Sequence, residues 1–167
     1  MKIRSLTTIA ILVSLSLLLS YIERLIPPII PLPGIKIGLS NLVIIIVLYL
    51  FNVKYCLYIS LAKVLLISIL FGNFVSLSLS LGGSMLSLLV MYGLKKINIF
   101  TEVGVSCAGG VFFNIGQIVI AMIIFSNINL YYYIPILILS GTISGMVIGI
   151  VGKMVVERLV YVNKVVQ

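Results

Sequence analysis

The chain has 167 residues, of which 62% are hydrophobic and only 8% are charged. A soluble domain carries charge on roughly a quarter of its residues, so this composition excludes a water-covered globular domain and indicates an integral membrane protein. The formal net charge is +8. Because the basic residues are dispersed between apolar segments, we exclude nucleic acid as a partner and expect contacts with the lipid bilayer.

The inventory of reactive side chains excludes most catalytic chemistry. The chain has no Asp and no His, and its carboxylates are Glu23, Glu102 and Glu157. Ser–His–Asp catalysis is therefore impossible, and a phosphate-binding Gly-x-x-x-x-Gly-Lys-Ser/Thr loop is missing. We expect no enzyme activity, no ATP hydrolysis, no metal site and no cofactor. Cys56 and Cys107 lie in apolar segments and are interpreted as packing residues.

Six apolar segments follow one another along the chain. A transmembrane helix needs about 20 residues, and only the second segment falls clearly short of that length. No connection is long enough to separate two domains, so we expect a single integral membrane domain over residues 1–167. The prediction is an all-α membrane protein with six transmembrane helices in one bundle, over approximately 6–26, 37–51, 55–72, 74–94, 103–126 and 132–152.

The first segment follows Lys2 and Arg4 and resembles a signal peptide, but no Ala-x-Ala cleavage site follows it. We expect it to be an uncleaved first span. The residues after Gly152 are expected to extend the last helix to the membrane interface, where Lys and Arg side chains can reach the headgroups.

The basic residues fall mainly on one side of this six-span arrangement. Arg24 and Lys36 lie on the outer side, and Lys63 lies within a span. The positive-inside rule then predicts that both termini are cytoplasmic. The inner side holds Lys2, Arg4, Lys54, Lys95, Lys96, Lys153, Arg158 and Lys164.

The connection between the first two segments, residues 26–36, is apolar and holds four of the five prolines of the chain. Proline removes a backbone donor and fixes φ, so this stretch is not expected to be helical. Two interpretations stay open. The loop is a lid or a re-entrant plug over the outer mouth of the bundle, or it is a stiff connector at the level of the headgroups.

Lys63 lies in the middle of the third segment, where an ionisable group costs about 2.5–3.5 kcal/mol on insertion scales. It must therefore face the bundle interior or water. Ser60 and Cys56 precede it at helical spacing. Two interpretations of Lys63 stay open. It binds an anionic group of a substrate or contacts a partner protein, or it has a structural role and pairs with a backbone carbonyl or with Glu23.

The fifth segment carries Asn114 and Gln117 on one helix face between small residues. Such amides either bind a ligand or hold helices together, with bonds worth roughly 0.6–2 kcal/mol. Asn41 and Asn73, near the outer ends of the second and third segments, are expected to complete an outward-facing pocket. The candidate substrate contacts are Glu23, Arg24, Lys36, Asn41, Lys63, Asn73, Asn114 and Gln117.

Small residues four positions apart indicate close helix packing. The sixth segment has this pattern at Gly141, Gly145 and Gly149, and the sequence leaves open whether the glycines meet another segment or a partner protein. Tyr131–Tyr133 mark the outer interface, and a second role as a gate over the pocket stays open.

Several runs resemble the Gx transporter family, also called heptaprenyl diphosphate synthase component I, over nearly the whole chain. The runs are 20–27 (SYIERLIP), 33–41 (PGIKIGLSN), 70–74 (LFGNF), 91–96 (MYGLKK) and 114–117 (NIGQ). Family members often carry His where this chain has Phe113 and Arg where it has Lys63, so a proton-relay role of that His does not transfer.

The resemblance implies a fold similar to the S-components of energy-coupling factor transporters. These are six-helix proteins that capture a vitamin-like molecule and dock on a membrane coupling subunit driven by ATPases. Ala10 and Ser14 would correspond to the small-residue docking patch on the first span. The resemblance also implies a setting of prenyl-quinone and flavin-linked redox metabolism in the bacterial cytoplasmic membrane.

Three hypotheses follow for the function. The first is a substrate-binding subunit of a small-molecule transporter. The second is a non-catalytic membrane component of a heptaprenyl diphosphate synthase, which would anchor or assist a catalytic subunit; the absence of Asp excludes an aspartate-rich Mg²⁺ site for diphosphate in the chain itself. The third is a scaffold of a membrane redox complex.

Overall fold

The computed structural model of the chain describes residues 3–25 and 38–165, and their side chains except those of residues 3–6, 24 and 162–165. These residues form helices and connections without a strand, so the predicted all-α class is confirmed. The elements are α1 (Ile3–Leu25), α2 (Asn41–Leu50), α3 (Val53–Phe71), α4 (Phe74–Ile97), α5 (Glu102–Phe125), the 3-10 helix η1 (Ile128–Tyr133) and α6 (Ile134–Val165).

Within residues 3–25 and 38–165, four helical units are long and apolar enough to cross a membrane: α3, α4, α5 and the continuous stretch Ile128–Tyr161. These units indicate a multi-pass membrane protein. The apolar part of α1, Thr7–Glu23, and α2 are shorter. At 1.5 Å per residue the ten residues of α2 extend about 15 Å, half of the hydrocarbon thickness of about 30 Å. The six-span count therefore stays a prediction.

Helix α2 is shorter than the predicted segment because a turn precedes it. Gly38 has a positive φ of 77°, a conformation that favours glycine, and the backbone N–H of Asn41 donates to the Gly38 carbonyl at 2.7 Å. The helix is buried on several sides and packs against α1, α3 and α6. Its core residues are Val43, Ile44, Ile45, Val47 and Leu48.

The carboxyl end of α2 is held by the end of α4. The Lys95 ammonium donates to the carbonyl of Leu48 and lies 5.1 Å from the ring centroid of Tyr49. The last carbonyls of a helix lack partners within the helix and attract cations. Lys95 therefore fixes the position of α2, in addition to the topological role that its charge predicts.

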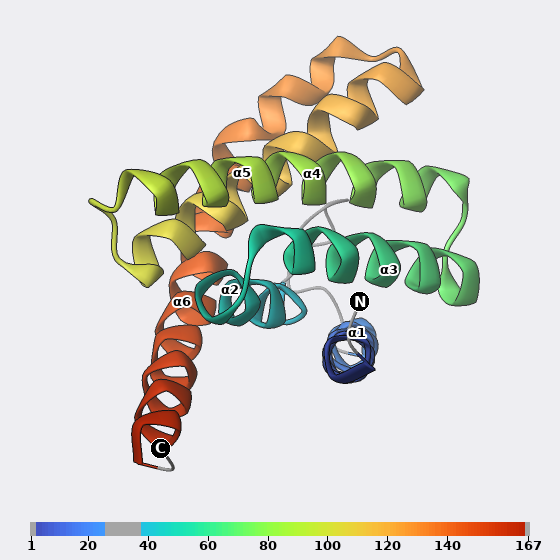
Figure 1. The fold of residues 1–167 in the computed structure, drawn as a ribbon. Coiled ribbons are helices and arrows are strands. Elements are labelled where there is room, and N and C mark those ends of the chain that lie inside the picture. Colours follow the sequence, from blue (N-terminus) through green and yellow to red (C-terminus); the bar gives the residue numbers. More distant parts are fainter. Residues whose placement is uncertain (1–2, 26–37, 166–167) are drawn as a thin grey trace.

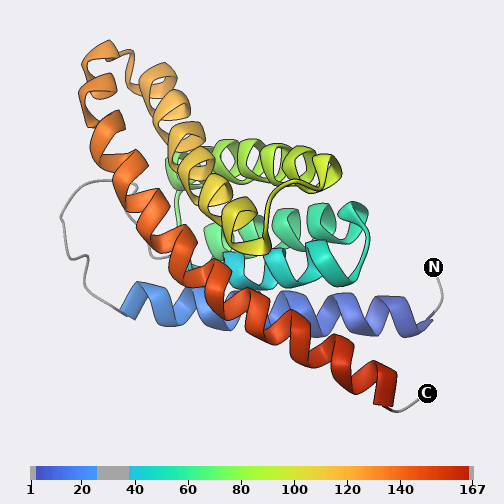
Figure 2. The ribbon, with the colours of Figure 1, turned by 90° about the vertical axis from the view of Figure 1, so that its left-hand side faces the viewer.

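The helices do not all run in one direction. In Figure 1, α3 and α4 lie side by side across the view, whereas α1 is seen nearly end-on. In Figure 2, α1 begins and α6 ends on the right-hand side, and the connection between α5 and η1 lies at the upper left. The two ends of the helical chain thus lie on the same side of the molecule in this view.

Helix α5 is packed between α4 and α6 through glycines. A Cβ added to Gly145 of α6 would lie 2.7 Å from the Cα of Cys107 in α5, and one on Gly116 of α5 would lie 2.8 Å from the Cα of Gly83 in α4. These contacts join backbone to backbone. The glycines of α6 therefore meet another helix of the same chain, which decides the question that the sequence left open.

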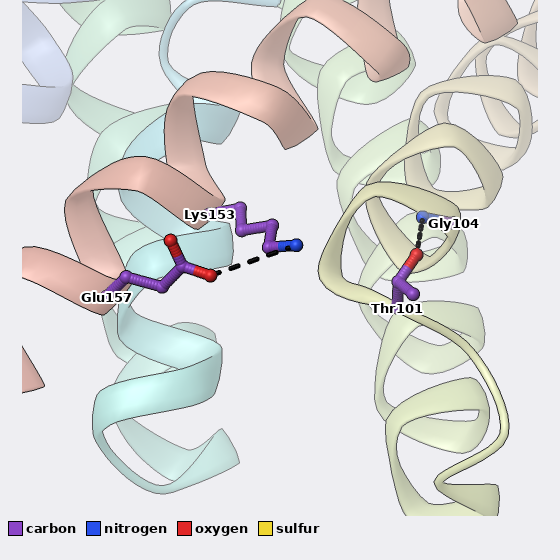
Figure 3. Close-up of polar contacts among 4 residues, drawn as sticks. All are labelled: Thr101, Gly104, Lys153 and Glu157. Atoms are coloured by element: carbon purple, nitrogen blue, oxygen red, sulfur yellow. Dashed lines mark hydrogen bonds and ion pairs between the residues drawn. The ribbon is translucent and has the colours of Figure 1, made fainter.

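Helix α6 continues beyond the predicted span to Val165, which confirms the expected extension after Gly152. Its 32 residues extend about 48 Å at 1.5 Å per residue. Lys153 and Glu157 form an exposed ion pair at 3.8 Å on this extension (Figure 3). Nearby, the Thr101 hydroxyl caps α5 by accepting the Gly104 N–H at 3.3 Å (Figure 3).

Candidate ligand-binding site

Lys63 is turned away from the helix surface that lipid would contact. Its side chain is only 6% exposed, because α3 places it against the turn before α2. The ammonium donates to the Ser40 hydroxyl at 3.2 Å and to the Asn41 side-chain oxygen at 3.3 Å. Hydrogen bonds to neutral oxygens stabilise a buried ammonium, so this lysine has a local structural role whatever else it binds.

Glu23 lies in the last turn of α1 and binds the turn that precedes α2, which Lys63 also contacts. Its Oε1 accepts the backbone N–H of Gly38 at 2.5 Å. This bond links the end of α1 to the start of the α2 region, fifteen residues further along the chain. Glu23 and Lys63 thus both contact the stretch 38–41.

A small cavity of about 90 Å³ lies beside these two residues. We call it the lysine cavity. Its polar lining comes from α1, α3, α4 and the turn before α2, and Phe113 of α5 closes part of its wall. The residues that matter for its chemistry are Ser20, Glu23, Ser40, Lys63, Ser80 and Phe113.

A larger cavity of about 330 Å³ lies between α4, α5, η1 and α6. We call it the amide cavity. Most of its surface is apolar, with three amides and two serine hydroxyls, which is the composition typical of a small-molecule site. Its lining includes Asn73, Ser76, Ser80, Asn114, Gln117 and Leu137.

The two buried amides of the amide cavity differ in their hydrogen bonds. Asn114 is 3% exposed, and its Nδ2 donates to the Leu137 carbonyl of α6 at 2.9 Å. Gln117 is 6% exposed, and its Oε1 has no hydrogen-bond partner among the described residues. A buried acceptor left without a partner costs roughly 1–3 kcal/mol. Asn114 therefore ties two helices together, whereas Gln117 has a buried acceptor that no described residue satisfies.

The predicted contacts are divided between the two cavities. Glu23 and Lys63 line the lysine cavity, and Asn73, Asn114 and Gln117 line the amide cavity. Asn41 binds Lys63 and lines a separate hollow of about 20 Å³. The side chain of Arg24, residue Lys36 and the proposed lid over 26–36 lie outside the described residues.

Sequence reasoning missed the serines and Phe113. Ser76 and Ser80 follow Asn73 at steps of three and four, so the three residues form one polar stripe on α4 that reaches from its start towards Lys63. That spacing was visible in the sequence. It was obscured by Ser78 and Ser84, which line neither cavity.

Ala10 and Ser14, the predicted docking patch, lie on the exposed face of α1. The Ser14 hydroxyl donates to the Ala10 carbonyl of the same helix at 2.9 Å. A short side chain that bonds its own backbone leaves a shallow surface, which is compatible with close approach of another helix.

The family model for heptaprenyl diphosphate synthase component I matches residues 12–155. The chain belongs to this family. The matched range includes every cavity-lining residue named above and leaves out Ala10. Comparison with curated proteins and with solved structures gave no match to this chain.

Proposed function

We propose that the chain is the membrane-embedded substrate-binding subunit of a small-molecule transporter in the bacterial cytoplasmic membrane. The substrate class is vitamin-like and related to flavins or quinones. One observation carries the proposal: a mainly apolar cavity of about 330 Å³ is lined by three amides, among them the buried Gln117. The Gln117 Oε1 is buried and has no partner among the described residues, so a ligand that offers a donor as this side chain turns towards the cavity gains a hydrogen bond that the empty protein lacks.

In the proposed mechanism the substrate is captured from the outer side. Asn73 at the start of α4 lies at the end of the amide cavity nearest the α3–α4 connection, and Gln117 and Asn114 lie further along α5. Glu23 and Lys63 would make polar contacts in the lysine cavity, and Arg24, Lys36 and Asn41 remain proposed substrate contacts that are not assigned to either of the two cavities. A six-span arrangement with cytoplasmic termini, together with closure by the 26–36 loop, belongs to the same proposal.

The energy would come from a partner, because the chain has no phosphate-binding loop. The proposed partner is a membrane coupling subunit with ATPases. The exposed small residues Ala10 and Ser14 on α1 would receive it.

The direct test is native mass spectrometry of the protein purified in mild detergent. We expect wild-type protein to retain a small molecule, and Gln117→Leu to retain less by about tenfold, the effect of losing about 1.4 kcal/mol. Thr142→Val is the matched control, since Thr142 lies on α6 and bonds only its own helix at Ile138. Wild-type protein that never carries a small molecule would overturn the proposal.

The family description favours a second candidate, a non-catalytic membrane component of a heptaprenyl diphosphate synthase. Copurification separates the two. A prenyl synthase catalytic subunit bound to the chain supports the second candidate, whereas a coupling subunit with ATPases supports transport. A scaffold of a membrane redox complex, in contrast, would keep its function in the double variant Lys63→Leu with Asn114→Leu.

A further inference from the structure

The two cavities meet at one residue. Ser80 of α4 lines both the lysine cavity and the amide cavity, and Phe113 and Asn114, neighbours on α5, line one cavity each. The stripe Asn73, Ser76 and Ser80 leads along α4 from the amide cavity to the lysine cavity. The two cavities are therefore adjacent, and a single elongated molecule that occupied both would lie along α4 and pass Ser80.

The lining of the amide cavity favours a ligand with an apolar body. Its walls are mainly hydrocarbon and aromatic, and burial of apolar ligand surface against such walls drives binding. The amides and serines lie at intervals along this surface, so they orient a ligand without requiring a charged one. The apolar walls come from Leu79, Ile118, Ala121, Phe125, Leu130 and Leu137.

The lining of the lysine cavity favours a ligand whose end is polar and uncharged. Lys63 and Glu23 both line it, so the formal charges of its described side chains sum to zero. A further anion would lie close to the Glu23 carboxylate in a space of about 90 Å³, where water screens repulsion poorly. A neutral group with an acceptor for Lys63 and a donor for a serine hydroxyl or Glu23 meets no such repulsion.

We propose that one ligand occupies both cavities: a mainly apolar molecule whose body fills the amide cavity and whose small, uncharged, hydrogen-bonding end lies beside Lys63. This inference rests on the proposed function and narrows its substrate class. It argues against a diphosphate end, because several negative charges would then face one ammonium and one carboxylate among the described side chains.

The test compares three probes with the same hydrocarbon chain, namely farnesol, farnesoic acid and farnesyl diphosphate, on the full chain in lipid nanodiscs. We expect farnesol to bind more tightly than either anionic probe by about tenfold or more. Glu23→Gln should shift the preference towards farnesoic acid by about tenfold, since it removes the opposing carboxylate. A wild-type preference for farnesyl diphosphate would overturn the inference.

The shared position of Ser80 has its own test. Ser80→Leu should weaken farnesol binding by about tenfold, because the larger side chain fills the junction between the cavities. Ser78→Leu is the matched control on the same helix, since Ser78 lines neither cavity. Equal binding by the wild-type protein and Ser80→Leu would contradict a ligand that spans both.

Failure of this inference is distinguishable from failure of the proposed function. A carboxylate or diphosphate found on the purified wild-type protein overturns the uncharged end and leaves a substrate-binding subunit in place. Wild-type protein that retains no molecule and binds none of the probes overturns both.

Discussion

Individual polar residues in this chain combine structural and binding roles, and their contacts distinguish the two. Lys63 bonds Ser40 and Asn41, and Asn114 bonds the backbone of α6. Both side chains would be conspicuous in a sequence whether or not a ligand exists. Among the described residues that line the two cavities, Gln117 is the one with a buried acceptor that has no partner, so its substitution is the most informative about binding.

The helix-pairing role of Asn114 gives a stability prediction. Asn114→Leu should lower the free energy of unfolding by about 0.6–2 kcal/mol, because it removes the interhelical bond to the Leu137 carbonyl. The measurement is equilibrium unfolding in mixed detergent micelles. Val119→Leu, at an exposed position on α5, should have little effect, and equal stability of both variants would contradict the pairing role.

At this scale the sequence predicted which amides share a face of α5, because helical spacing fixes that face. It did not predict the hydrogen bonds from Lys63 to Ser40 and Asn41, since those residues are more than twenty positions away in the sequence. Such contacts depend on how α2 and α3 pack, and periodicity carries no information about that.

Among the elements, α2 differs most from its prediction. The apolar run suggested a transmembrane segment over 37–51, but the helix begins at Asn41 after the turn at Gly38. The sequence does show why α2 is buried: nearly every residue is aliphatic, which is typical of a helix surrounded by protein or lipid. It does not show which of the two surrounds it.

Lys95 is expected to stabilise this short helix. Lys95→Met should lower the free energy of unfolding by about 1.5–3 kcal/mol, the range for a hydrogen bond to a charged group, because the Leu48 carbonyl loses its cation. Hydrogen exchange of the α2 amides should accelerate in the same variant. Lys96→Met, at the exposed neighbouring position, is the control, and equal exchange in both variants would show that Lys95 does not hold α2.

The contact between α5 and α6 gives a second prediction for an element. Gly145→Ala would bring a Cβ within 2.7 Å of the Cys107 Cα, so the helices must separate, at a cost of about 1–3 kcal/mol. Gly93→Ala should instead be neutral or stabilising, since nothing lies within 4 Å of its added Cβ. The thermal unfolding midpoints of both variants measure the difference, and a stable Gly145→Ala protein would contradict the close packing.

For the whole molecule, composition predicted the membrane class and the helical fold because lipid admits few alternatives. The sequence did not predict the marked change of direction between α1 and α3, which Figure 1 shows. Crossing angles follow from how surface ridges fit together, and no single segment encodes them. The side of the membrane on which each connection lies remains a prediction from charge.

Cysteine labelling in intact cells tests that prediction. In a background with Cys56→Ala and Cys107→Ala, an impermeant maleimide should label Lys36→Cys and Asn129→Cys directly. It should label Lys54→Cys and Lys96→Cys only after the membrane is broken, because the positive-inside rule places these positions in the cytoplasm. Direct labelling of Lys54→Cys or Lys96→Cys would reverse the proposed orientation.

The glycine contacts on both faces of α5 also bear on how a guest is chosen. Since α4, α5 and α6 approach backbone to backbone at Gly116, Gly141 and Gly145, movement of side chains can change the spacing of these helices only slightly. The amide cavity lies between these helices and therefore keeps a fixed shape, selecting molecules by fit. The lysine cavity borders α1 and α3, which among the described residues make no such glycine contacts with α4, α5 or α6. We therefore expect the lysine cavity, and not the amide cavity, to adjust to ligands of different size.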